Sequence, residues 1–213
     1  MFNTHVQTLK NWVAQHLRIL GTIVAILWVI EIINMIAGHR LEIFGIQPRT
    51  LVGLRNILFA PFLHRGFWHL FANTFPFVIL GWFVMLRGVH EFFYVSIVAG
   101  LVSGLGAWLF GAAHTIHLGM SGVIFGYMGY LLLRGYFEQG AISLALAVLA
   151  LFLYGSMLWN VLPTQPDISW QGHLFGLVGG GVAAYRHRGV RPLWPNVELN
   201  KLIGSGKSVD SRQ

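Results

Sequence analysis

Long apolar runs leave this 213-residue chain few ways to fold in water. Hydrophobic residues make up 55% of the sequence and charged residues only 10%, whereas a soluble domain typically has about a quarter of its residues charged. The longest runs reach the roughly 20 residues that an α-helix needs to cross the hydrocarbon core of a bilayer. We therefore expect an all-α, polytopic membrane protein that is surrounded by lipid.

Six runs are predicted to span the membrane, at residues 18–38, 69–86, 92–110, 121–133, 141–162 and 173–185. An even number of spans places both termini on the same side. Ten of the fourteen Lys and Arg residues fall on that side, and the other four lie in the loop after the first run. Because short cytoplasmic loops are enriched in Lys and Arg, we expect both termini to face the cytoplasm.

The remaining segments complete the predicted organisation. In the first external loop, residues 51–63 are apolar but too short to span, so we expect them to lie in the membrane interface. The predicted membrane domain covers residues 1–188, including a short cytoplasmic segment at 1–17, and a polar cytoplasmic tail follows at 189–213. The first run does not look like a removable signal peptide.

Charge and composition narrow the expected chemistry. The formal charge of +7 would suggest nucleic acid in a soluble protein, but the basic residues flank apolar runs, so we expect a bilayer and no nucleic-acid partner. The absence of cysteine excludes disulfides and thiolate chemistry. We expect no cofactor and no metal, because the histidine pairs His114/His117 and His64/His69 are not accompanied by an H-E-x-x-H motif.

The segment Gly119-Met120-Ser121-Gly122 places a serine between glycines where a loop is expected to enter a helix. Glycine allows a tight turn and close approach of another group. The N-terminus of a helix also offers unpaired N–H groups that can stabilise an oxyanion. These properties suit a nucleophile at Ser121, although taken alone the segment fits small-residue helix packing better.

A histidine, His173, opens the last predicted span. Glycines on one face of that span recur every four residues, at Gly172, Gly176 and Gly180. The fourth span offers a similar face, with Gly122, Gly126 and Gly129. Close packing of these faces would bring His173 within hydrogen-bond range of Ser121, since both spans run in the same direction. The alternative is a packed histidine with a backbone partner.

A third feature is His69 and Asn73, which lie four residues apart and so share a helix face. Both could donate hydrogen bonds to a developing oxyanion, or could simply bond neighbouring helices together. Asp167 precedes His173 and could orient it, but a Ser–His pair fits the sequence better than a triad. An aspartyl mechanism is excluded because no two Asp residues lie in the spans.

In combination, these motifs resemble the rhomboid family of intramembrane serine proteases, in its basic six-helix bacterial form, over about residues 50–188. The segment around Ser121, with Gly119 and Gly122, looks like the family's G-x-S-G. His173, before the small-residue repeat that includes Gly176, looks like its base.

Two further matches to the family lie near the second span. His69 and Asn73 match the H-x-x-x-N pattern of the family, and His64 matches a histidine that commonly precedes this pattern.

The resemblance implies a rhomboid-type bundle of six transmembrane helices with a membrane-embedded first external loop. It implies peptide-bond hydrolysis in or near the transmembrane segments of protein substrates, by a Ser121–His173 dyad through an acyl-enzyme. Asn73, His69 and the Ser121 N–H would hold the oxyanion, and Phe125 would pack on the base. The expected location is the inner membrane of a bacterium.

The sequence departs from the family pattern at one place. Many relatives carry a Trp-Arg pair in the first loop, whereas Arg55 here has no Trp before it.

Two rival functions remain. A catalytically silent relative that binds membrane clients would lack Ser121 or His173, and both are present. A transporter could use Glu31 in the first span, but the sequence shows no paired broken helices of the inverted-repeat kind.

Overall fold

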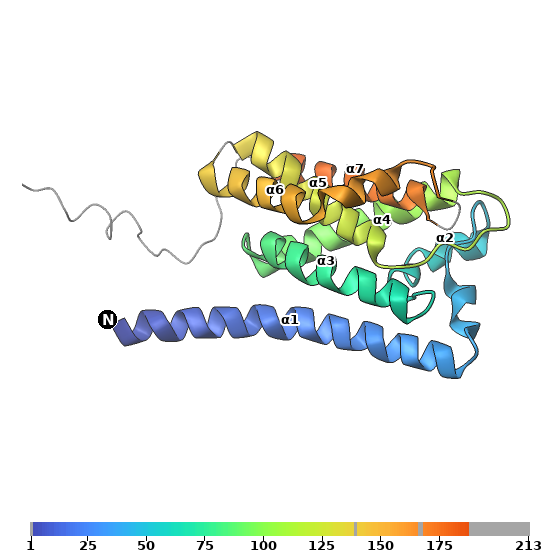
Figure 1. The fold of residues 1–213 in the computed structure, drawn as a ribbon, viewed down its shortest axis with the longest axis horizontal. Coiled ribbons are helices and arrows are strands. Elements are labelled where there is room, and N and C mark those ends of the chain that lie inside the picture. Colours follow the sequence, from blue (N-terminus) through green and yellow to red (C-terminus); the bar gives the residue numbers. More distant parts are fainter. Residues whose placement is uncertain (1, 139, 166–167, 188–213) are drawn as a thin grey trace, which may run out of the picture.

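The computed structural model describes residues 2–138, 140–165 and 168–187, and these residues form α-helices joined by short 3₁₀ turns and loops (Figure 1). The α-helices are α1 (Phe2–Ile36), α2 (Leu51–Asn56), α3 (Phe67–Met85), α4 (Val89–Phe110), α5 (Ser121–Glu138), α6 (Ala141–Tyr154) and α7 (Trp170–Arg186). The 3₁₀ helices are η1 (Arg40–Phe44), η2 (Ala60–Phe62) and η3 (Gly155–Val161). The predicted all-α class is confirmed.

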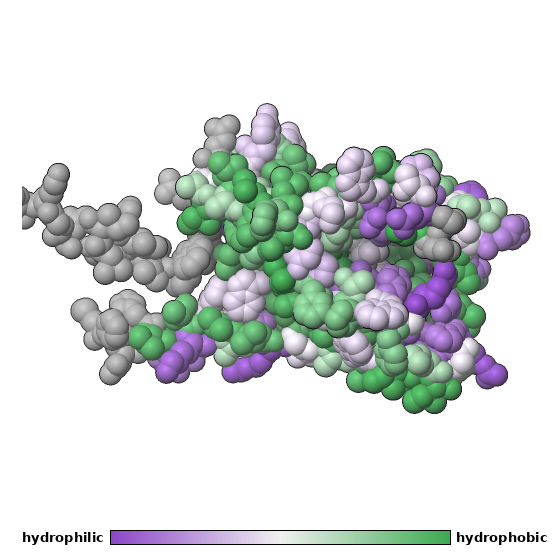
Figure 2. Space-filling model, viewed as in Figure 1, coloured by the Kyte–Doolittle hydropathy of each residue, from purple (hydrophilic) through white to green (hydrophobic). Residues whose placement is uncertain are grey.

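The flank of the bundle is apolar. Four helical segments are long and apolar enough to cross a bilayer: Val6–Ile36, Phe67–Met85, Val89–Phe110 and Ala141–Val161. Large apolar side chains on them face outward, including Ile97 on α4 and Phe152 on α6, which are 60% and 83% exposed. On the face shown in Figure 2, apolar residues cover much of the flank, and hydrophilic residues gather toward the end that holds α2. Such a surface is stable in lipid and would aggregate in water.

The other two predicted spans are α5, which is buried inside the bundle, and α7, which packs against α4 and α5 and leaves one face exposed, at Val178, Val182 and Tyr185. Every residue of α5 from 122 to 131 is buried, and α5 packs against α3, α4, α6 and α7. A helix that is largely covered by protein need not be strongly apolar, and both α5 and α7 are rich in glycine. Six spans therefore stay a prediction, with α5 at the centre and α7 beside it.

Two predicted boundaries, at residues 17 and 133, fall inside longer helices. The segment predicted as 1–17 is continuous with the first span, and α1 is about 52 Å long, well beyond the roughly 30 Å hydrocarbon core. α5 continues five residues past the predicted end at 133, because Arg134 and Glu138 form an ion pair at 2.6 Å that Arg87 also joins. α6 ends at Tyr154 and continues as η3, where Gly155 and Ser156 are poorer helix formers, but the segment that could cross a membrane, Ala141–Val161, agrees with the span predicted at 141–162.

α5 and α7 approach so closely that glycines are required at their contact. A Cβ on Gly176 would overlap the carbonyl of Gly122, and a Cβ on Gly180 would overlap the carbonyl of Gly126. A Cβ on Gly129 would likewise collide with the backbone of Leu177. The close packing expected from the glycine repeats is confirmed, and it holds the N-terminal ends of the two helices together.

The loop between α1 and α3 is anchored through Asn56, which is fully buried. Its side-chain amide donates to the carbonyls of Ile43 and Gly45 at 3.0 and 2.9 Å. Its oxygen accepts from the Arg55 guanidinium at 3.0 and 3.1 Å. Arg55 therefore supports this loop through its neighbour Asn56.

We predict that Gly180→Ala lowers the stability of the folded protein by about 1–3 kcal/mol, because the new methyl group must push α7 away from α5. The measurement is the denaturant midpoint in mixed micelles. The matched control is Gly21→Ala in α1, where a Cβ would meet nothing within 4 Å. Equal stability of the two variants would show that the close contact of α5 and α7 is not required.

Candidate active site

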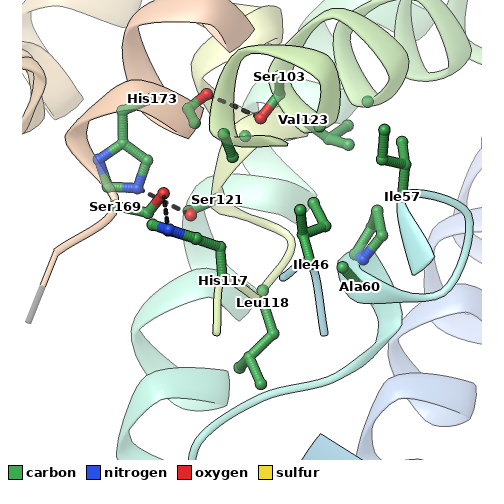
Figure 3. A pocket seen from close by; sticks show the side chains of 17 residues that line it. Ile46, Ile57, Ala60, Ser103, His117, Leu118, Ser121, Val123, Ser169 and His173 are labelled. Carbon is green, nitrogen blue, oxygen red and sulfur yellow. Dashed lines mark hydrogen bonds between the residues drawn. The ribbon is translucent and has the colours of Figure 1, made fainter. Parts of the chain in front are cut away.

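Ser121 and His173 meet at the N-terminal ends of α5 and α7 (Figure 3). The Oγ of Ser121 lies 2.8 Å from the Nε2 of His173. Ser121 is the first residue of α5, so its own N–H has no acceptor within the helix. A hydroxyl, an imidazole and an oriented N–H therefore converge at one point.

The protonation of His173 follows from its second partner. The Nδ1 atom lies 3.1 Å from the backbone carbonyl of Asn160 in η3. Because a carbonyl can only accept, Nδ1 carries the proton and Nε2 presents its lone pair to Ser121. The Ser121 hydroxyl therefore donates to His173, which is the arrangement that a general base requires.

The ring of His173 is held from one side by Phe125. The two rings stack with their centroids 4.2 Å apart and an angle of 11° between their planes. Phe125 lies one turn after Ser121 on α5 and is 1% exposed. This contact leaves His173 little freedom to rotate away from the serine.

Hydrogen-bond donors lie beside Gly119, close to Ser121. Gly119 has a φ of +119°, a conformation that favours glycine. A Cβ built on it would lie 3.0 Å from the Nε2 of His69 and 3.8 Å from the Nδ2 of Asn73.

The His69 ring is oriented by the backbone N–H of Arg65, which donates to Nδ1 at 3.3 Å, so Nε2 carries the proton. The Nδ2 of Asn73 is buried and has no hydrogen-bond partner among the described residues. Both donors are thus available to an anion near Gly119.

His64 supports the loop that leads to Ser121. Its Nε2 accepts the N–H of Met120 at 3.3 Å, and the neighbouring Gly119 N–H donates to the carbonyl of Ala60 at 2.9 Å. The side chain is fully buried, and this burial, with a smaller contribution from His69, lowers the pKa of His64 to about 3. A neutral His64 can keep accepting from Met120 at physiological pH.

A cavity of about 30 Å³ opens beside the pair. It is lined by residues that include Ser103, His117, Ser121, Ser169 and His173 (Figure 3). Ser103 donates to the carbonyl of Gly172 at 2.7 Å. A space of this size with polar walls accommodates about one or two water molecules.

The structure brings together most of the residues singled out from the sequence. Gly119, Gly122 and Phe125 surround Ser121, whereas Gly176 acts one turn further along α7 by letting the helices approach.

Asp167 lies outside the described residues. The backbone carbonyl of Asn160 and the side chains of Ser103 and His117 were missed, since no local motif marks them. Among the described residues, no group of three His, Asp or Glu side chains is arranged to hold a metal ion.

Comparison with known proteins places this arrangement in a family. A family model described as Rhomboid domain matches residues 53–188, more than half of the chain. The chain belongs to the rhomboid family. It is therefore an integral, polytopic membrane protein, in agreement with the apolar helices of the fold.

The similar curated proteins include mycobacterial relatives. An uncharacterized protein of Mycobacterium tuberculosis is 39% identical over 189 residues, covering 84% of this chain and 78% of that protein. An uncharacterized protein of Mycobacterium leprae is 36% identical over 183 residues, covering 82% and 72%. A protein of Bacillus subtilis named "Putative rhomboid protease YdcA" is 28% identical over 134 residues, covering 58% and 62%.

The lowered pKa of His64 predicts a pH-dependent loss of stability in this rhomboid protein. As pH falls below about 6.5, the unfolded chain binds a proton at His64 before the folded protein does, so stability is lost progressively between about pH 6.5 and pH 3. Between pH 7.5 and pH 5 we expect the free energy of unfolding of wild type to fall by about 2 kcal/mol more than that of His64→Gln, because the amide of that variant cannot titrate. Denaturant titrations in micelles at pH 7.5 and 5 measure this difference, and identical losses for both proteins would contradict it.

Proposed function

We propose that this rhomboid protein is an intramembrane serine endopeptidase. It hydrolyses peptide bonds in or near the transmembrane segments of other membrane proteins. The observation that carries the proposal is the hydrogen-bonded chain from Ser121 through His173 to the carbonyl of Asn160, at 2.8 and 3.1 Å. This chain gives the serine a base with a defined tautomer, which a purely structural serine at a helix contact does not need.

The reaction follows from the positions of these atoms. Ser121 Oγ attacks the carbonyl carbon of the scissile bond while its proton passes to His173 Nε2. The imidazolium formed keeps its Nδ1–H on the Asn160 carbonyl and then donates the Nε2 proton to the leaving amine. This leaves an acyl-enzyme on Ser121, which water hydrolyses with His173 again acting as the base.

Negative charge on the carbonyl oxygen would be stabilised beside Gly119. The Ser121 N–H, the Nε2–H of His69 and the Nδ2 of Asn73 are the donors that we assign to this oxyanion. Two of them come from α3 and one from α5, so the oxyanion site depends on how these helices pack. Oriented donors of this kind lower the barrier because they need no reorganisation during the reaction.

The orientation in the membrane is part of the proposal. With six spans and both termini in the cytoplasm, the N-terminal ends of α3, α5 and α7 face the external side, where water can reach Ser121 and His173. The C-terminal ends of α3, α5 and α7 carry the basic residues Arg87, Arg134 and Arg186. Their cytoplasmic placement agrees with the enrichment of Lys and Arg in cytoplasmic loops. We propose the inner membrane of a bacterium as the location and the bilayer and transmembrane proteins as the partners.

Cleavage of single-pass reporter proteins in liposomes tests this function. The reporters carry transmembrane segments with Gly and Pro at different depths. Wild type is expected to cut at least one of them, and Ser121→Ala and His173→Ala are expected to lose about 10⁴-fold or more of the rate, because both act in one step. Thr22→Ala, which removes an exposed hydroxyl from α1 outside the site, is the matched control and should cleave normally.

Two results would contradict the proposal. Cleavage at the wild-type rate by a folded Ser121→Ala variant would exclude this serine as the nucleophile. A folded wild type that binds the reporters and cuts none of them would favour a protein that binds membrane clients without chemistry.

A further inference from the structure

A second histidine, His117, lies in the active-site cavity, in the loop that leads to Ser121 (Figure 3). Its Nδ1 atom lies 2.7 Å from the hydroxyl of Ser169, and its Nε2 atom lies 2.8 Å from the hydroxyl of Thr115. The Thr115 hydroxyl in turn donates to the carbonyl of Ala112 at 2.7 Å. These bonds form a continuous chain through the imidazole.

The direction of each bond in the chain is determined. Thr115 gives its only proton to Ala112, so its oxygen must accept from His117, and Nε2 therefore carries the proton. Burial, with a smaller contribution from the charge of Arg65, lowers the pKa of His117, which keeps the ring neutral. The remaining ring nitrogen, Nδ1, then accepts from the hydroxyl of Ser169. All hydrogen-bonding groups of the imidazole are satisfied in this one orientation.

The chain joins the two segments that carry the reacting residues. On one side, the backbone of His117 is fixed by two hydrogen bonds to Ile46, at 2.7 and 2.9 Å, and Ser121 follows four residues later. On the other side, Ser169 directly precedes α7, and its carbonyl accepts the N–H of His173 at 3.1 Å. Movement of Ser169 therefore moves the first turn of α7, where His173 lies.

The neighbouring bonds hold α7 to a different element. Ser103 on α4 donates to the Gly172 carbonyl at 2.7 Å, and Gln171 donates to the carbonyl of Phe110 at the end of α4, at 3.2 Å. These contacts fix α7 against α4 but do not reach the loop before Ser121. The bond between His117 and Ser169 supplies that connection.

We propose that His117, through Ser169, is a positioning residue that sets the distance between Ser121 and His173. The proposal rests on the proposed function, because it assigns His117 a role in the reactivity of that pair. It predicts that loss of the His117–Ser169 bond slows the chemical step while leaving binding of the reagent or substrate unchanged.

The test uses the full-length protein in mild detergent and a fluorescent fluorophosphonate as the probe, with the rate of modification at saturation (kinact) and the half-saturating concentration (KI) measured separately. His117→Phe keeps a planar ring and loses both ring hydrogen bonds, and Ser169→Ala removes a single oxygen. We expect kinact to fall about tenfold in each variant, with KI changed by less than about twofold. The double variant should be no slower than the slower single variant, because both changes break the same bond.

A rescue variant distinguishes the loss of positioning from a general destabilisation of the fold. The amide of His117→Asn can accept from Ser169 near the place of Nδ1, so this variant should recover most of kinact even though it loses the bond to Thr115. Thr115→Val is the matched control, since it removes a bond on the far side of the ring and should label nearly as fast as wild type.

The outcomes are distinguishable. Wild-type kinact in His117→Phe, or losses that multiply in the double variant, would overturn the proposal. If His117→Phe does not fold, Ser169→Ala decides alone, and a normal kinact in that variant would overturn the proposal as well. Absence of labelling in folded wild type would instead refute the proposed function on which the inference rests.

Discussion

The contact between the backbones of α5 and α7 determines the rest of the site. Gly176 and Gly180 lie against the carbonyls of Gly122 and Gly126, where no side chain would fit. In a bilayer, helices gain little from burying apolar surface against each other, so close packing of small residues supplies much of their association. Because the contact extends to the N-terminal ends of both helices, it also brings together the helix ends that carry Ser121 and His173.

The loops at that end are held by several hydrogen bonds to buried groups, while two buried polar side-chain atoms of the described residues at the site have no partner. Buried backbone must find internal partners, and here Ile46 pairs with His117, Ala60 accepts from Gly119, and the buried Glu31 carboxylate accepts from Gly66. Among the described residues, Asn73 Nδ2 and His64 Nδ1 are buried polar atoms without a hydrogen-bond partner. Such exceptions are expected at functional sites, and Asn73 is the one that points toward Gly119 and the proposed oxyanion.

Much of this arrangement could be predicted from local patterns. Runs of apolar residues predicted four of the helices that are long and apolar enough to span, and the four-residue glycine repeats predicted the contact of α5 with α7. The carbonyl of Asn160 could not be predicted, because any residue supplies a carbonyl and only the path of η3 brings this one to His173. The role of His117 in the hydrogen-bond chain was equally hidden, since its partner Ser169 is distant in sequence. The length of α5 was underestimated because ion pairs formed only in the folded protein offset its charges.

The central claim is that His173 activates Ser121, and the most direct test is the site of covalent modification by a fluorophosphonate. Wild-type protein in mild detergent would be labelled, digested and mapped by mass spectrometry. We expect one adduct, on Ser121, and no adduct in a folded His173→Ala variant, because the serine loses the base that lies 2.8 Å from its oxygen. An adduct on Ser121 that forms at the same rate without His173, or an adduct on a different serine, would contradict it.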